Sequence, residues 1–165
     1  KFLSLTLALA MLGTALTGCG SKTAAPETSV EPTQQTAPYQ QEQSQTEKAL
    51  ALINTFATGD TDTARSLLSD GYIQHNLAYG TGADAFIGSV EYLASADVKT
   101  TVNNIRAFED GDKVFLQTIY NFAGAGEQVA FDIFRFDENG KIAEHWDVME
   151  TIADQSTWQN QNGKF

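Results

Sequence analysis

The chain has 165 residues and a formal net charge of −11, the balance of 10 basic and 21 acidic residues. This acidic excess argues against binding to nucleic acid, which depends on Lys and Arg neutralising phosphates, and against adhesion of the folded part to an anionic membrane surface. The length allows one modest domain, and the single cysteine, Cys19, excludes an internal disulfide or a cysteine-based zinc cluster.

The first 18 residues predict a signal peptide. An apolar run over residues 2–16, too short to span a bilayer comfortably, leads to Leu16-Thr17-Gly18-Cys19. This string resembles the bacterial lipobox, whose cysteine is lipidated and becomes the first residue of the mature protein. The resemblance implies a lipid anchor on Cys19 and an extracytoplasmic place in the bacterial cell envelope. The alternative is an ordinary secretory peptide with a chance cysteine.

A polar linker is predicted after the signal peptide, over residues 19–44. It is rich in Ser, Thr, Gln and Glu and contains all three prolines of the chain. Because this segment has few apolar side chains to bury, we expect it to be disordered and to hold the domain away from the lipid surface. The folded domain is therefore predicted to span residues 45–165.

Three helices are predicted at the start of the domain. Ser44 and Glu47 have the spacing of a capping box, apolar residues then recur at helical intervals, and Gly59 marks the end of the first helix. A second helix is predicted over residues 61–69 and a third over residues 83–96.

The rest of the domain has the patterns of β-strands. Residues 72–76, between the second and third helices, predict only a brief extended or irregular segment. Asn139-Gly140, which separates two apolar and aromatic runs, is the strongest short signal for a hairpin. Four main strands are predicted over residues 100–108, 114–122, 130–136 and 141–149. Helices followed by antiparallel strands predict an α+β domain.

The last hairpin carries polar groups among residues of core type. Asp132, His145 and Asp147 lie in strands otherwise rich in Phe, Ile, Val and Trp. Burying a polar group is costly unless the group is paired. These three side chains therefore belong either to a structural network in which each polar group is hydrogen-bonded or to a functional site.

The pairing of these two strands depends on the turn between them. A two-residue turn at Asn139-Gly140 places Asp132 opposite Asp147, whereas a three-residue loop with a bulge at Gly140 places Asp132 opposite Trp146. We favour the first register. In it, two carboxylates that lie close together in an aromatic cavity cannot both ionise easily, so one of them can serve as an acid or base near neutral pH.

The favoured register also assigns the side chains to two faces. One face shows Asp132, Phe134, Phe136, Ala143, His145 and Asp147, with Phe136 opposite Ala143. The other face includes Ile142, and on it Arg135 lies opposite Glu144 as a structural ion pair.

Several segments resemble one known family. They are Tyr72-Ile73-Gln74-His75-Asn76, Asp110-Gly111-Asp112, Asp132-Ile133-Phe134-Arg135-Phe136 and Gly140-Lys141-Ile142-Ala143-Glu144-His145-Trp146-Asp147. Together they are similar to the SnoaL-like group of the NTF2-like superfamily, which is named for a polyketide cyclase. The resemblance covers roughly residues 46–152, and it implies a cone-shaped fold in which three helices pack on a curved antiparallel sheet of four main strands.

The resemblance also implies a site. In the cyclases a cavity aspartate acts as acid and base, while an asparagine and a glutamine help to bind the oxygens of the substrate. By position, Asp132 is similar to that aspartate and Asn76 to the asparagine, and Gln117 is a candidate for the glutamine. The expected catalytic residues are Asp132, His145 and Asp147. The expected substrate-binding residues are His75, Asn76, Gln117, Phe134 and Phe136.

The function expected from these residues is cofactor-free acid–base chemistry of the aldol, isomerase or cyclase type, on a small apolar compound with a carbonyl or hydroxyl group. Two alternatives stay open, because such a fold hosts enzymes and binders alike. One is a module that captures a hydrophobic ligand without turnover, and the other is an interaction module that forms a homodimer through the outer face of the sheet. A metal held by His75, His145 and an aspartate is conceivable, but nothing in the spacing requires it, so we expect neither metal nor cofactor.

Overall fold

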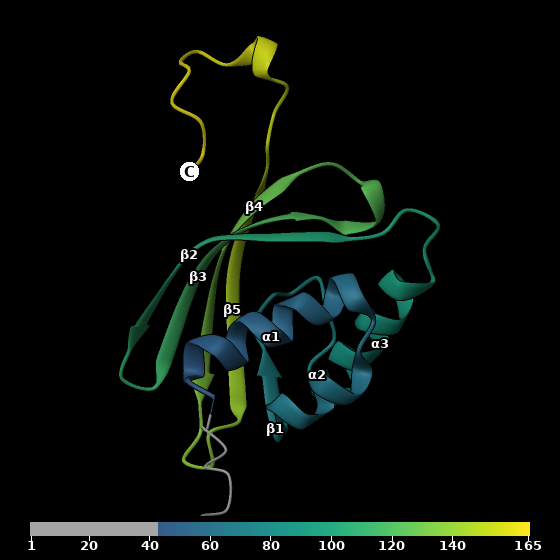
Figure 1. The fold of residues 1–165 in the computed structure, drawn as a ribbon, viewed down its shortest axis with the longest axis vertical. Helices are drawn as coiled ribbons and strands as arrows, with labels where there is room; N and C mark the ends of the chain where they lie inside the picture. The colour runs from purple at the N-terminus through teal and green to yellow at the C-terminus, as the bar shows by residue number, and fades with distance from the viewer. Residues whose placement is uncertain (1–42) are drawn as a thin grey trace, which may run out of the picture. The chain divides into compact units, whose positions relative to one another are not determined.

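The computed structural model describes residues 43–165, in which three helices pack on one face of a five-stranded sheet (Figure 1). The helices are α1 (Gln45–Thr58), α2 (Thr61–Leu67) and α3 (Ala83–Ser95). The strands are β1 (Leu68–Gln74), β2 (Thr101–Asp110), β3 (Lys113–Asn121), β4 (Gln128–Phe136) and β5 (Ile142–Thr151), with two 3-10 turns, η1 (Phe122–Gly124) and η2 (Gln155–Thr157). The predicted α+β fold is confirmed. The predicted signal peptide, most of the predicted linker and Cys19 lie outside the described residues.

The helix boundaries follow from their capping residues. Ser44 Oγ accepts a hydrogen bond from the Glu47 N–H (3.1 Å), and the Glu47 carboxylate accepts one from the Ser44 N–H (2.8 Å), so the predicted capping box starts α1. Gly59 ends α1 in the left-handed conformation, with φ of 74°. The second helix ends at Leu67, earlier than predicted, because Leu68 already belongs to a strand.

The sheet has the order β1-β5-β4-β3-β2. Strands β2 to β5 form the predicted antiparallel series, but β1 adds a fifth strand that runs parallel to β5. The prediction of a purely antiparallel sheet is therefore corrected to a mixed one. Residues 72–74 of the segment predicted as extended or irregular belong to this strand, in which Ile73 pairs with Glu144 and Gln74 with His145.

The hairpin of β4 and β5 combines features of both predicted registers. Asp137 N–H donates to the Lys141 carbonyl (2.8 Å), which closes a three-residue loop instead of the two-residue turn. A bulge then adds Ala143 to β5, so Phe136 pairs with Ile142, and the predicted Phe136–Ala143 pair is wrong.

Beyond the bulge, the favoured register is confirmed. Asp132 pairs with Asp147, Phe134 with His145, and Arg135 with Glu144. The extra residue turns both Ile142 and Ala143 toward the core, which corrects the prediction that Ile142 lies on the outer face. The longer loop shifts the pairing of β4 with β5 by one residue, and the bulge at Ala143 shifts it back by one. The two shifts therefore cancel before the strands reach Asp132 and Asp147.

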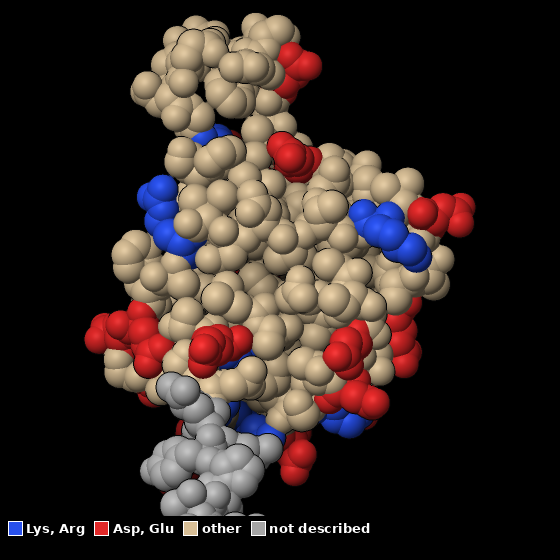
Figure 2. Space-filling view, in the orientation of Figure 1, with Lys and Arg blue, Asp and Glu red and all other residues tan. Residues whose placement is uncertain are grey.

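The hydrophobic core lies between the helices and the inner face of the sheet. Leu52 and Val90 are fully buried on the helices, and Val114, Leu116 and Phe134 contribute from the sheet. On the face shown in Figure 2, charged side chains lie mainly near the margins. None of the helices in residues 43–165 has both the length and the apolar character needed to cross a bilayer.

Candidate active site

A cavity of about 530 Å³ lies between the helices and the inner face of the sheet. This volume is in the range of sites for small molecules. Its apolar lining includes Ile53, Phe56, Phe86, Leu93, Phe122 and Met149. Its titratable wall comprises Tyr72, Tyr120, Asp132, His145 and Asp147. The cavity therefore combines an apolar body with one polar wall, formed by four strands of the sheet.

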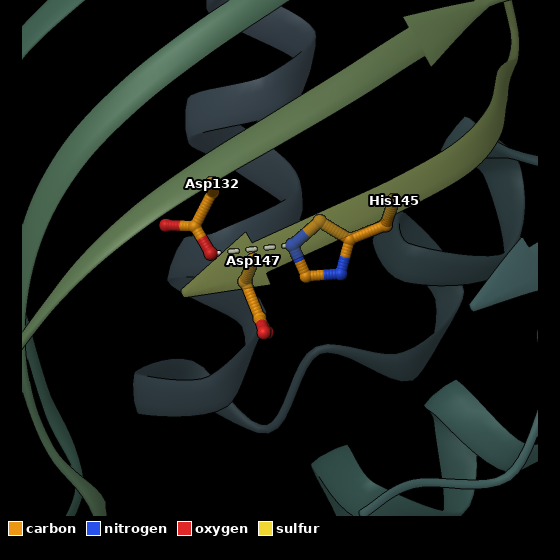
Figure 3. A group of neighbouring side chains, drawn as sticks. All are labelled: Asp132, His145 and Asp147. Carbon is orange, nitrogen blue, oxygen red and sulfur yellow. Dashed lines mark hydrogen bonds and ion pairs between the residues drawn. The ribbon is translucent and has the colours of Figure 1, made fainter. Parts of the chain in front are cut away.

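The centre of this wall is formed by Asp132, His145 and Asp147 (Figure 3). Asp132 lies on β4, and the other two lie on β5 with one residue between them, so all three side chains project from the same face. The structure thus brings together the three residues predicted as catalytic. Phe134, which lines the same cavity, stacks on the His145 ring with 4.4 Å between the ring centroids.

Both carboxylate oxygens of Asp132 are engaged by the protein. Its Oδ2 accepts a hydrogen bond from the Tyr120 hydroxyl (2.9 Å), and its Oδ1 lies 3.2 Å from His145 Nε2. The side chains of Asp132 and His145 are buried, with 4% and 8% exposed. Burying an acidic group is tolerable here because hydrogen bonds satisfy it.

Asp147 is held differently. Its Oδ1 accepts a hydrogen bond from Asn76 Nδ2 (2.7 Å), so Asn76 contacts a carboxylate of the wall and does not itself line the cavity. Among residues 43–165, no group donates a hydrogen bond to Asp147 Oδ2. In Figure 3 the carboxylate of Asp147 points away from the Asp132–His145 pair. Asp147 therefore presents a carboxylate oxygen that a ligand can reach.

Two tyrosine hydroxyls complete the wall. Burial raises the pKa of Tyr120 well above its usual value, and the negative Asp132 beside it raises it further. Burial likewise raises the pKa of Tyr72, with additional contributions from Asp147 and then Asp132. Both tyrosines therefore remain protonated hydrogen-bond donors at neutral pH.

The sequence reasoning missed Gln74, which connects the wall to β1. Its Nε2 lies 3.0 Å from His145 Nδ1 and 3.3 Å from the Tyr72 hydroxyl. Strand alternation would have placed the Gln74 side chain on the same side as Tyr72 and Asn76, with His75 on the other, although it does not give the contact with His145. The prediction leaves this segment open between extended and irregular, so it does not use the pattern.

Of the five residues expected to bind the substrate, only Phe134 lines the cavity, and Asn76 reaches the site only through its hydrogen bond to Asp147. His75 is on the outer face of the sheet, where it stacks on Trp146 with 4.5 Å between the ring centroids. Gln117 Nε2 donates to the Lys164 carbonyl (2.8 Å), and its cross-strand partner Phe131 is on the outer face as well. Phe136 is buried in the core beyond the lining.

A metal ion does not fit these residues easily. Ligand atoms of Asp132, His145 and Asp147 lie within 4.8 Å of one another. Both ring nitrogens of His145 are already hydrogen-bonded, so an ion would have to displace one of these bonds. His75, on the opposite face of the sheet, cannot share an ion with His145, which removes the arrangement considered from the sequence.

On the outer face, Glu144 forms the predicted ion pair with Arg135 and also bonds to His75 Nε2 (3.3 Å). The hydrogen bond from Arg135 holds the pKa of Glu144 below its ordinary value, and the bond from His75 lowers it further. A carboxylate with a lowered pKa in the folded state stabilises the fold above its unfolded pKa, and this contribution is lost as the pH falls through the folded value.

We therefore expect Glu144→Gln to lower the free energy of unfolding at pH 7 by up to about 1 kcal/mol. The difference from the wild type should shrink as the pH falls below the unfolded-state pKa of about 4.3, because the unfolded wild-type carboxyl then also gains its proton. Urea unfolding at pH 7 and at about pH 3.5 measures both values, with the exposed Glu127→Gln as control. An equal loss at the two pH values would contradict the assignment to charge.

Sequence comparison gives one family match. A family model described as a SnoaL-like domain matches residues 49–145, which is more than half of the chain. The comparison with curated proteins found no match.

Solved structures with the same fold come from several bacteria. An NTF2-like protein of unknown function from Cytophaga hutchinsonii is 16% identical, with a TM-score of 0.57 over 67% of this chain and 94% of that one. An LEH-like epoxide hydrolase from M. tuberculosis is 18% identical, with a TM-score of 0.56 over 64% of this chain and 82% of that one. IdmH, a proposed polyketide cyclase from Streptomyces antibioticus, is 18% identical, with a TM-score of 0.53 over 66% and 93%. At such identities the similarity shows the fold alone.

Proposed function

Given that the chain belongs to the SnoaL-like domain family, we propose that its domain is a cofactor-free acid–base enzyme. Its substrate is a small, largely apolar compound with a carbonyl or hydroxyl group. The observation that carries this proposal is the grouping of Asp132, His145 and Asp147 on one wall of an otherwise apolar cavity. General acid–base catalysis needs a titratable group within hydrogen-bond reach of the reacting proton.

The two aspartates of the wall have different roles in this proposal. Asp147 exchanges a proton with the ligand, because it has an oxygen that accepts no hydrogen bond from residues 43–165. Asp132, which has hydrogen bonds from Tyr120 and His145 on its two oxygens, is held in place beside it. Asn76 orients Asp147.

The reaction class is proton transfer next to a carbonyl, as in aldol, isomerase and cyclase chemistry. Two fold neighbours are a proposed polyketide cyclase and an LEH-like epoxide hydrolase. The apolar lining favours a ligand that is mostly hydrocarbon, with its oxygen directed at the sheet.

A hydrogen-exchange experiment tests this proposal. Small cyclic ketones and alcohols are first screened for a rise in Tm, since a ligand that binds the folded state stabilises it. Each ketone that binds is then incubated with the protein in D2O, and the loss of its α-protons is followed by NMR. The proposal expects exchange well above the rate in buffer, and binding without exchange for every ketone would refute it.

The competing function is a binding module that captures the same class of ligand without turnover. The specific observation in its favour is that Asp132 already has hydrogen bonds on both oxygens, as a structural carboxylate would. A second alternative, a homodimer through the outer face of the sheet, is supported by the exposed Phe115, Phe131 and Val148 on that face.

We further propose that the domain is tethered to a bacterial membrane through a lipid on Cys19, outside the cytoplasm. The support is the resemblance of Leu16-Thr17-Gly18-Cys19 to a lipobox. We expect Cys19→Ala to move the protein from the membrane fraction to the soluble fraction of cells that express the whole precursor. Fractionation and blotting measure this, and an unchanged membrane share would contradict the anchor.

A further inference from the structure

One side chain links the backbone of β1 to the polar wall of the cavity. Gln74 Oε1 accepts a hydrogen bond from the Asn76 N–H (2.9 Å), while Gln74 Nε2 lies 3.0 Å from His145 Nδ1. The Gln74 side chain is partly buried, and it reaches His145 because β1 and β5 are paired there.

These contacts determine which way the Gln74 amide points. The backbone N–H of Asn76 can only donate, so the atom that faces it must be the amide oxygen. The amide nitrogen is then directed at His145 and at the Tyr72 hydroxyl. The orientation of the Gln74 amide therefore follows from its hydrogen-bond partners, which distinguish the amide oxygen from the amide nitrogen.

The orientation of the amide in turn determines the tautomer of His145. An amide nitrogen only donates, so His145 Nδ1 must accept. In a neutral imidazole the other nitrogen then carries the proton. That nitrogen, Nε2, lies 3.2 Å from Asp132 Oδ1, where it donates to the carboxylate.

We propose that Gln74 is a positioning residue that fixes His145 in the Nε2–H tautomer and thereby makes His145 a donor to Asp132. Asp132 then faces two donors, His145 and the Tyr120 hydroxyl, whose raised pKa keeps its proton in place. His145 has no free acceptor nitrogen, so it does not take a proton from the ligand, and Asp147 is left as the group that does. This last step rests on the proposed function, whereas the tautomer does not.

The tautomer can be measured directly. The chain has two histidines, so His75→Gln leaves the His145 ring as the only imidazole in an untagged, 15N-labelled protein. A long-range 1H–15N spectrum distinguishes a protonated ring nitrogen from an unprotonated one. In this background we expect Nε2 to be protonated and Nδ1 to be unprotonated.

Two substitutions change the partner of Nδ1. In Gln74→Glu one carboxylate oxygen still accepts from Asn76, and the other faces Nδ1 as an acceptor, so Nδ1 should gain a proton. In Gln74→Met the donor to Nδ1 is absent and only the Asp132 carboxylate still favours Nε2–H, so a minor share of the Nδ1–H tautomer should appear. A protonated Nδ1 in the His75→Gln protein, in which Gln74 is retained, would overturn the proposal. An unprotonated Nδ1 after Gln74→Glu in the same background would overturn it as well.

The same variants separate this proposal from the proposed function. If no ketone exchanges its α-protons but the tautomer responds as described, the enzyme assignment fails and the role of Gln74 stands. If exchange occurs and the tautomer is unaffected by Gln74→Glu, the role of Gln74 fails alone. Tm values of the variants show that each one is folded when its spectrum is recorded.

Discussion

Asp147→Asn is expected to reduce α-proton exchange of a bound ketone by about 10²- to 10⁴-fold, the usual contribution of a general acid or base. The substitution keeps the size of the side chain, and the amide oxygen can still accept the hydrogen bond from Asn76. What it removes is the carboxylate oxygen to which no group of residues 43–165 donates. The rate constant is measured by NMR in D2O, and ligand binding by the shift in Tm.

The control for Asp147→Asn is Asp70→Asn, which removes an exposed carboxylate from β1 without touching the cavity lining. We expect its exchange rate and its ligand binding to match the wild type. An Asp147→Asn variant that exchanges at the wild-type rate would remove Asp147 from the mechanism. Asp132→Asn tests the site less cleanly, because both oxygens of Asp132 accept hydrogen bonds and an amide can replace only one of them.

Gly88→Leu is expected to weaken ligand binding by at least tenfold while leaving the fold as stable as before, or more stable. Gly88 lies on α3 and lines the cavity, and a Cβ added there meets no heavy atom within 4 Å. A leucine side chain can therefore extend into open space at this position and narrow the cavity. A helical glycine is also less favourable than leucine by roughly 0.5–1 kcal/mol, so the helix itself gains.

Gly88→Ala is the matched control for this second prediction. It provides a similar gain in helix propensity but fills the space of one carbon only, so binding should stay close to the wild type. The dependence of Tm on ligand concentration measures affinity for all three proteins. If Gly88→Leu binds as tightly as the wild type, the ligand does not occupy the part of the cavity next to α3.

The local parts of this fold were predictable from short stretches of sequence. Ser44 and Gly59 bound α1 as expected, since a capping box and a C-terminal glycine act over a few residues. The pairing of Asp132 with Asp147 was also predicted, although by a turn that the structure does not contain. Two shifts of one residue, in the loop and at Ala143, cancel between the turn and the site.

The parts that sequence reasoning missed depend on contacts between distant segments. The partner of β1 is β5, near the other end of the domain, so nothing next to Gln74 showed that it would reach His145. The face on which Gln117 lies depends on how β3 pairs with β4 across an irregular connection. Its resemblance to a substrate-binding glutamine was positional, and the pairing turns its side chain away from the cavity.

The place of β1 at the edge of the sheet has a consequence for how the site forms and opens. Among residues 43–165 this strand pairs with β5 alone, and the pairing is irregular between Leu68 and Ile73. Loops that join distant segments close late in folding, and edge segments open at lower free energy than the centre of a sheet. Detachment of β1 would separate Gln74 from His145 and leave both hairpins paired. The polar wall is therefore expected to be completed last as the chain folds, and to come apart first when it unfolds.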